Sequence, residues 1–212
     1  MSTQMTEPTD TIWIEPTQKR SREKVERLLD AALDLAVEKG SLDIKVTEVA
    51  KRAGVAIGTL YQFFPTRTAL IAKLFAREMR PIDEVVGAAL LGTASFNDLR
   101  DRIEEALKET LGLVTTKPGL AVIWSSASLD PAIEAADFAN TRQNAKILAN
   151  LMQSFLLDRA NTKQIAVTAL IICHLWGSVI RLCLLAGPDE KEDLLKEYSN
   201  MLALQGRSLA GI

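Results

Sequence analysis

The sequence predicts an all-α protein, and three features of the chain support this fold class. Apolar residues recur at steps of three and four along most of the chain, which is the period of an amphipathic helix. The strong helix formers Ala, Leu, Glu, Lys and Arg dominate the composition. Aromatic residues contribute only 5%, and Gly and Pro only 11 and 7 of the 212 residues, which disfavours a turn-rich β-sandwich or barrel.

The charge distribution divides the chain into parts. Residues 1–18 carry three acidic and no basic side chains and show no sustained period, so we expect a mobile tail there. Residues 19–80 carry 13 Lys and Arg against 8 Asp and Glu, whereas residues 81–212 carry 12 against 16. This asymmetry indicates a polyanionic partner at one end only. We therefore expect a small basic domain at 19–65 and a larger helical domain at 66–212.

The helices are predicted in order along the chain. The first follows Ser21, which can cap its start, and ends at Gly40, which can supply a left-handed residue. Two short helices at 46–53 and 57–63 come next, and a longer helix ends before Pro81. Starting from that longer helix, the remaining segments are expected at 66–79, 82–91, 97–115, 120–126, 131–155, 162–186 and 190–204, about nine helices in all.

The compartment is predicted from the start of the chain and from its cysteines. No basic, apolar leader begins the sequence, which indicates a cytoplasmic protein. Cys173 and Cys183 lie about 15 Å apart on one expected helix, too far for a disulfide, and fit reduced thiols. The apolar run 165–180 contains His174 and is followed by Arg181. A buried core or interface helix therefore fits better than a membrane span, and we expect no membrane partner.

The segment 46–63, VTEVAKRAGVAIGTLYQF, has the spacing of a helix-turn-helix. Counting from its first residue, position 5 must be small where the two helices cross, and it is Ala50. Position 9 begins the tight turn and favours a positive φ, and it is Gly54. An ordinary pair of packed helices would need no glycine there. The apolar positions that the two helices share hold Val49, Ala53, Val55, Leu60 and Phe63. Basic side chains flank the segment and favour a DNA partner, namely Lys19, Arg20, Arg22, Lys24, Lys45, Lys51, Arg52 and Arg67.

The run VTEVAKRAGVAIGTLYQFFPTRTALIAKL, preceded by LLDAALDLAVEKG, resembles the N-terminal domain of TetR-family transcriptional regulators over about residues 22–75. Its most specific parts are AGV, GTLYQFF and FPTRTAL. The resemblance implies a three-helix DNA-binding domain and a palindromic double-stranded operator. It also implies a C-terminal helical region that binds a small-molecule effector and forms a homodimer. The implied function is ligand-responsive regulation, most simply a repressor that the effector releases from its operator.

The resemblance assigns DNA contacts at the start of the second short helix. Gln62 would bond adenine, Thr59 a base or a phosphate, and Ile57 a thymine methyl. Gly58 lets the backbone approach the groove, and Tyr61 would bond a phosphate. A further phosphate contact falls to Arg67.

Four positions depart from the family pattern. Thr47 and Phe63 stand where many relatives carry phosphate donors, and Lys45 and Ala56 stand where a capping hydroxyl is usual. The operator sequence therefore cannot be predicted. The predicted DNA-binding set is Lys45, Thr47, Ile57, Gly58, Thr59, Tyr61, Gln62, Phe63 and Arg67.

The C-terminal region shows no catalytic pattern and no metal-spaced cluster, so we expect no enzyme activity, no metal and no cofactor. His174 is either a hydrogen-bonded core residue or a functional one. Arg181 needs either a carboxylate on a neighbouring helix or a ligand anion. Apolar walls with a few polar groups suit a small-molecule site. The residues predicted to line it are Trp124, Phe138, Phe155, His174, Trp176 and Arg181.

A dimer interface is predicted on the last two helices. Ala169, Cys173 and Gly177 recur every four residues, which allows another helix to approach closely. These two helices either form half of a dimeric four-helix interface or complete a monomeric bundle. The predicted interface set is Ala169, Cys173, Gly177, Leu194, Tyr198 and Met201.

Two other functions remain open on the sequence. The basic segment could dock a protein or a membrane surface, which sequence-specific and steeply salt-dependent DNA binding would exclude. An all-helical enzyme is the other alternative. The lack of a nucleophile–base pair argues against it.

Overall fold

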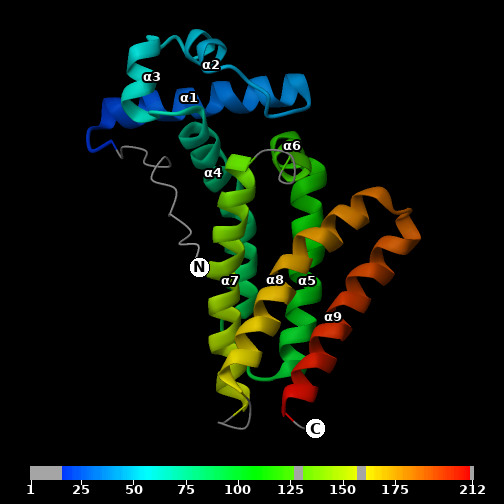
Figure 1. Ribbon diagram of the computed structural model, residues 1–212. Coiled ribbons are helices and arrows are strands. Elements are labelled where there is room, and N and C mark those ends of the chain that lie inside the picture. The colour runs from blue at the N-terminus through cyan, green and yellow to red at the C-terminus, as the bar shows by residue number, and fades with distance from the viewer. Residues whose placement is uncertain (1–15, 127–130, 157–160, 211–212) are drawn as a thin grey trace, which may run out of the picture. The chain divides into compact units, whose positions relative to one another are not determined.

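The computed structural model describes residues 16–126, 131–156 and 161–210, and within these ranges it contains nine α-helices and no strand. The all-α prediction is therefore confirmed. Of the tail expected at 1–18, residues 1–15 lie outside the described residues. Figure 1 shows the short helices α2 and α3 beside α1, and the long helices α5, α8 and α9 lying against one another.

Helix α1 (Lys19–Lys39) buries one apolar stripe and begins three residues before the start predicted after a Ser21 cap. Its N-cap is Gln18, whose side chain makes no capping bond, so the prediction that Ser21 caps the helix is wrong. Gly40 ends the helix as predicted, with φ 62°. The amides of Gly40 and Ser41 donate to the carbonyls of Val37 and Ala36, which satisfies the last turn.

Helix α4 (Arg67–Leu90) continues through Pro81, where the sequence predicted a break. Proline removes one backbone hydrogen bond inside a helix, which favours an end or a kink. The helix persists because Met79 and Ile82, on either side of the proline, are both buried in the protein. Tertiary burial outweighs the local preference here.

Helix α5 (Phe96–Thr116) packs against both α8 and α9. Its start is a reciprocal cap, because Ser95 Oγ accepts from the Asp98 amide and the Asp98 carboxylate accepts from the Ala94 amide. Gly206 of α9 lies directly against the Phe96 ring, so α9 can approach α5 closely. The other helices are α6 (Pro118–Ser126), α7 (Pro131–Leu156), α8 (Thr162–Leu185) and α9 (Pro188–Ala210).

The chain divides into two compact units, and the boundary falls inside α4, between Glu78 and Met79. The first, which we call the head unit, contains α1, α2, α3 and the first part of α4, and it also takes in Ser126 and the start of α7. The second, the body unit, contains the rest of α4 and most of the other helices.

Helix α8 is long and apolar enough to cross a membrane by length and composition, with a mean hydropathy of 1.9 over its most apolar window. Only a third of that window is buried. The buried part faces the chain itself, through Ile165, Ala169, Ile172 and Trp176. The exposed remainder leaves an apolar surface along this helix.

Candidate DNA-binding interface and effector domain

Helices α2 (Val46–Arg52) and α3 (Ile57–Phe63) form the predicted helix-turn-helix. Gly54 adopts φ 63°, the left-handed conformation that the spacing predicted. The Val55 amide donates to the Ala50 carbonyl at 3.0 Å, which closes the turn. Val49 and Leu60 are fully buried between the helices. Because the turn and its core are formed by the chain itself, α3 is held in a fixed orientation.

The outer side of α3 is open. Ile57 is 40% and Tyr61 is 47% exposed, and Gly58 and Gln62 are also exposed. Thr59 is half-buried. A Cβ atom added to Gly58 would meet nothing within 4 Å, so the chain's own packing does not require glycine there. This side of α3 is therefore available to an external partner.

The two short helices begin without side-chain caps. Lys45 and Ala56 are their N-caps, and neither makes a capping hydrogen bond. Lys45 and Thr47 are exposed at the start of α2, whereas Phe63 is half-buried at the end of α3. The neighbouring Phe64 is fully buried instead. The spacing predicted Phe63 as the core aromatic, but of two adjacent aromatics it could not single out the buried one.

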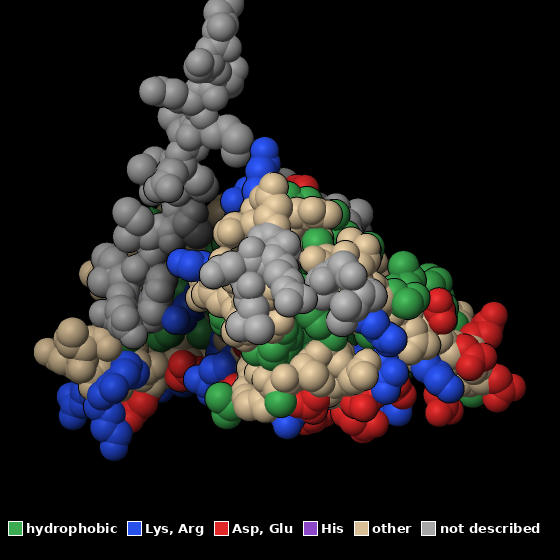
Figure 2. Space-filling model, turned by 90° about the horizontal axis from the view of Figure 1, so that it is seen from below, with side chains coloured by type: hydrophobic (Ala, Val, Ile, Leu, Met, Phe, Trp, Pro, Cys, Tyr) green, Lys and Arg blue, Asp and Glu red, His purple; other side chains and the backbone are tan. Residues whose placement is uncertain are grey.

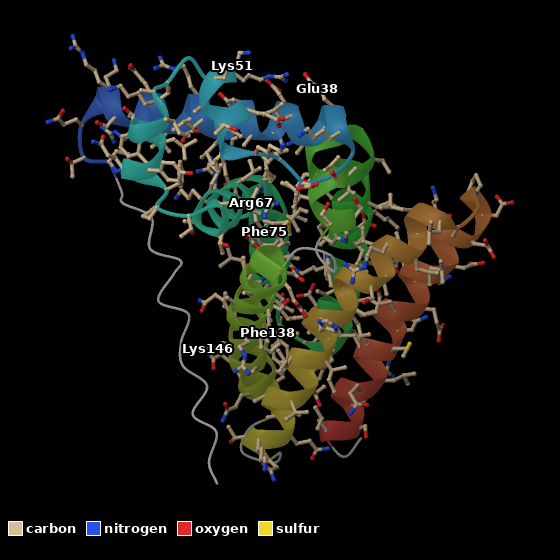
Figure 3. The ribbon with its side chains drawn as sticks, turned by 45° about the horizontal axis from the view of Figure 1, so that its top comes forward. Glu38, Lys51, Arg67, Phe75, Phe138 and Lys146 are labelled. Carbon is tan, nitrogen blue, oxygen red and sulfur yellow. The ribbon has the colours of Figure 1, made fainter. Side chains whose placement is uncertain are left out.

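Ion pairs hold α2 against the end of α1. Arg52 donates two hydrogen bonds to the Glu38 carboxylate, and Lys39 donates one to Glu48 at 2.7 Å. The hydrogen bond from Arg52 lowers the pKa of Glu38. Figure 3 shows Glu38 and Lys51 on the outer side of these helices. Arg52, a predicted basic flank, is therefore engaged within the chain, while Lys51 is exposed.

Arg67 occupies the start of α4 and is half-buried. Its Nε donates to the Ile44 carbonyl at 3.3 Å, and its terminal nitrogen donates to the Leu42 carbonyl. These bonds join α4 to the segment that precedes α2 (Figure 3). They give Arg67 a structural role, so the DNA contact assigned to it gains no support from this geometry.

Two tryptophans of the body unit differ in their hydrogen bonding. The Trp124 indole N–H donates to the Gly177 carbonyl at 3.3 Å and so joins α6 to α8. Trp176 is only 8% exposed, and its indole nitrogen has no hydrogen-bond partner among the described residues. A buried N–H without an acceptor is destabilising. An acceptor on a bound molecule would remove that penalty.

The Asp137 carboxyl of α7 lies near enough to Arg181 and His174 of α8 to be influenced by them, but no ion pair or hydrogen bond among the described residues joins it to either side chain. Burial raises the pKa of the Asp137 carboxyl, and the charges of Arg181 and His174 oppose that rise. Arg181 is half-buried and donates to the Ser178 hydroxyl, whereas His174 is exposed. Both alternatives for Arg181, a carboxylate on a neighbouring helix and a ligand anion, stay predictions. Asp137, which follows Glu134 by three residues near the start of α7, was not among the residues singled out from the sequence.

The two phenylalanines predicted for the effector site lie elsewhere. Phe138 is exposed on α7 and carries the Arg142 guanidinium 4.7 Å from its ring centre. Phe155 packs edge-on against Phe96, with the ring centres 5.2 Å apart. Of the predicted effector residues, Trp124 bonds to Gly177 of α8, and His174 and Arg181 both lie near Asp137. No group of three His, Cys, Asp or Glu side chains that could hold a metal ion occurs among the described residues.

The residues predicted for a dimer interface face in different directions. Ala169 and Tyr198 are buried within the single chain, and the Tyr198 hydroxyl donates to the Ile172 carbonyl. Gly177 lies against Trp124 and Arg181 of the same chain. Cys173 is half-buried, and burial raises the pKa of its thiol to about 12. Of the α9 residues, Leu194 is half-buried and Met201 is exposed.

Helices α8 and α9 also carry a group of exposed large apolar side chains, which we call the apolar stripe. On α8 its members follow steps of three, four and seven residues, so they share one face. Figure 2 shows apolar and acidic side chains together at the right edge of the molecule, on the side where α8 meets α9 in Figure 1. The stripe contains Val167, Ile171, Leu175, Leu182 and Leu185 of α8 and Met201 and Leu204 of α9.

Together these features define a class of protein: an all-helical DNA-binding regulator with a helix-turn-helix head and a separate helical body. Comparisons with known proteins agree. Residues 28–74 match the model of bacterial regulatory proteins of the tetR family, and residues 97–205 match the tetracyclin repressor-like C-terminal domain. The chain belongs to the TetR family of transcriptional regulators. It is accordingly a ligand-responsive DNA-binding regulator and not an enzyme.

Individual relatives are similar over part or most of the chain. The HTH-type transcriptional repressor KstR of Rhodococcus jostii (strain RHA1) is 29% identical over 157 residues, which cover 74% of this chain and 71% of that repressor. KstR of Mycolicibacterium smegmatis is 33% identical over 111 residues, or 50% of this chain and 54% of the relative. A TetR transcriptional regulator from Rhodococcus sp. RHA1 has a similar structure, with TM-score 0.56, 26% identity, and coverage of 87% of this chain and 97% of that one. A putative regulator from Streptomyces coelicolor A3(2), with TM-score 0.62, 22% identity, and coverage of 85% of this chain and 98% of that one, shares the fold.

Proposed function

We propose that this chain is a cytoplasmic repressor that binds a palindromic operator through α3 and releases it when a small molecule binds the body unit. The observation that carries the proposal is the exposed side of α3, with Ile57, Gly58, Tyr61 and Gln62 turned outward. Gln62 can make a bidentate contact to adenine in the major groove, and Tyr61 can donate to a phosphate.

The proposed regulator acts as a homodimer. Two copies can cover the apolar stripe of α8 and α9, which a single chain leaves exposed. A two-fold symmetric dimer presents two copies of α3, which matches the two half-sites of a palindrome. The surface proposed here shares Met201 with the predicted set, but not the buried Ala169 and Tyr198. The apolar character of α8 is then explained by an interface and not by a membrane.

The proposed effector is an apolar molecule that carries a hydrogen-bond acceptor. The body unit offers a largely apolar interior in which the Trp176 N–H lacks an acceptor among the described residues. One relative, 31% identical over 107 residues, which cover 50% of this chain and 45% of the relative, is named the fatty acid metabolism regulator protein of Bacillus subtilis (strain 168). That name supports fatty acids as the first compounds to test. To release DNA, the effector must bind the DNA-incompetent state more tightly, and the shift is limited by that difference in affinity.

The test is selection of binding sites from a random double-stranded DNA pool. We expect the wild-type protein to enrich a palindrome. Gln62→Ala should change the preferred base at one position in each half-site, at a free-energy cost of about 1–3 kcal/mol for removal of a bidentate contact. Tyr61→Phe should weaken binding to all sequences nearly equally, because it removes a phosphate contact.

The two variants control for each other, since both lie on the exposed side of α3 and keep its length. If Tyr61→Phe shifted the selected sequence as strongly as Gln62→Ala, the assigned roles would be wrong. If the wild-type protein enriched no sequence, the proposed operator binding would be wrong.

A further inference from the structure

Three helix ends meet at one end of the body unit. They are the start of α5, the end of α7 and the end of α9, and they lie where the chain finishes in Figure 1. Figure 2 views the molecule from this end, where apolar side chains show between polar ones. A surface cavity of about 420 Å³ is lined by residues of these three helix ends and of the turn before α5. Ligand pockets measure about 300–1,000 Å³, so this cavity has room for a small molecule.

One wall of the cavity is aromatic. Phe96 and Phe155 both line it and pack edge-on against each other, with the ring centres 5.2 Å apart. The Phe96 ring is held in place by Gly206 of α9, which lies directly against it. Phe155 is only half-buried, so part of its ring stays open. The chain thus presents a fixed apolar surface on which a flat apolar group can stack.

The cavity also contains a cation. Arg207 of α9 lines it, is exposed, and makes no ion pair or hydrogen bond through its side chain with a described residue. The acid in the first turn of α5, Asp98, is paired with Arg102 at 2.8 Å and so does not neutralise Arg207. A guanidinium stays charged at all physiological pH values, and its parallel N–H groups match a carboxylate. Arg207 is therefore placed to bind an anion beside the aromatic wall.

The other polar residues of the lining differ in what they can offer. Ser95 accepts from the Asp98 amide in the cap of α5. The Ser154 hydroxyl donates within α7 to a carbonyl one turn earlier, at 2.6 Å. The side-chain amide of Asn97 is exposed and has no partner among the described residues. It can donate a further hydrogen bond to an anion that Arg207 holds.

We propose that this cavity is a second ligand site, which binds an aromatic carboxylate with its ring on Phe155 and its carboxylate on Arg207. It is separate from the effector site proposed at Trp176, because none of its described lining residues lies on α8. It therefore does not depend on the proposed function. A ligand bound here joins the ends of three helices and stabilises the folded body unit by mass action.

The test is calorimetric titration of the full-length protein with 2-naphthoate, which has two fused rings and one carboxylate. 2-Naphthamide, of nearly the same shape but uncharged, is the control compound. We expect the wild type to bind 2-naphthoate about 10-fold more tightly or better, since hydrogen bonds between charged groups are the stronger ones. R207Q should weaken binding of 2-naphthoate by about 10-fold or more and leave binding of 2-naphthamide unchanged.

Three further variants locate the binding. R80Q removes the same charge from an exposed position on α4 of the body unit, outside the cavity, and should bind as the wild type does. S154F places a large side chain at an exposed position of the lining and should abolish binding of both compounds. W176F changes the proposed effector site and should bind 2-naphthoate normally. Circular dichroism checks that each variant is folded.

The outcomes that contradict the site are specific to it. The proposal is overturned if the wild type does not bind 2-naphthoate, or if R207Q binds it as tightly as the wild type. An equal loss in R80Q would also overturn it, because total charge would then account for the effect. Loss of binding in W176F with full binding in R207Q would place the compound near Trp176 instead. None of these results bears on operator binding, which the selection of binding sites tests separately.

Discussion

Ile171→Glu tests the proposed dimer surface, because Ile171 lies in the middle of the apolar stripe of α8 and is 53% exposed in the single chain. Fully burying an isoleucine side chain contributes about 1.5–3 kcal/mol. Covering the exposed half of Ile171 therefore contributes about 1 kcal/mol per subunit, and about 2 kcal/mol in a symmetric dimer that contains it twice.

Glutamate adds a second effect. A carboxylate taken out of water without a partner costs at least another 1–3 kcal/mol per interface. The total of about 3–5 kcal/mol corresponds to an increase of about 100- to 1,000-fold or more in the dimer dissociation constant. Sedimentation velocity at micromolar concentration measures this directly, and we expect the variant to sediment as a folded monomer.

Ile147→Glu is the matched control. Ile147 lies on α7, is 44% exposed, and receives the same substitution outside the stripe. We expect Ile147→Glu to remain dimeric. Operator affinity should fall for Ile171→Glu alone, because the second head no longer binds at a high effective concentration. A dimeric Ile171→Glu protein would refute the assignment of this surface.

Two more substitutions test the interior of the body unit. Trp176→Phe removes the unpaired indole N–H. A fatty acid that releases the operator should then bind about 2- to 10-fold more weakly in a fluorescence titration, which is the effect of removing one hydrogen bond. Unchanged binding would exclude Trp176 as the donor. Gly206→Ala places a methyl group into the Phe96 ring and should lower Tm by calorimetry, with a cost of about 1–3 kcal/mol. The control Gly112→Ala, whose added Cβ meets nothing within 4 Å, should leave Tm unchanged or raise it, and equal decreases in both variants would contradict the close approach of α9 to α5.

The sequence predicted the elements whose determinants are local. The positive φ of Gly54 and the ends of α3 followed from residue type and spacing within a few turns. The course of α4 through Pro81 could not be predicted this way, because burial of Met79 and Ile82 by distant parts of the chain decides it. Local propensity predicts a break there, and packing determines the outcome.

The site was predictable in part for the same reason. Helix α8 is apolar on nearly all sides, so its period could not show which face packs inside the chain and which stays exposed. The small residues Ala169 and Gly177 turned out to face the chain's own core and Trp124. The hydrogen bonds of Arg67 and the unpaired N–H of Trp176 depend on groups far away in the sequence, and no local pattern marks them.

The bonds of Arg67 affect how mutants of this regulator should be interpreted. Genetic screens score loss of repression, and a change at Arg67 would fall in the same phenotypic class as changes at Tyr61 or Gln62. The causes differ, however. Arg67 joins α4 to the carbonyls of Leu42 and Ile44, so its removal reduces the fraction of molecules with an intact head. A change at Gln62 leaves that fraction intact and alters what each molecule recognises. Mutant phenotype alone would therefore assign Arg67 to the operator contacts.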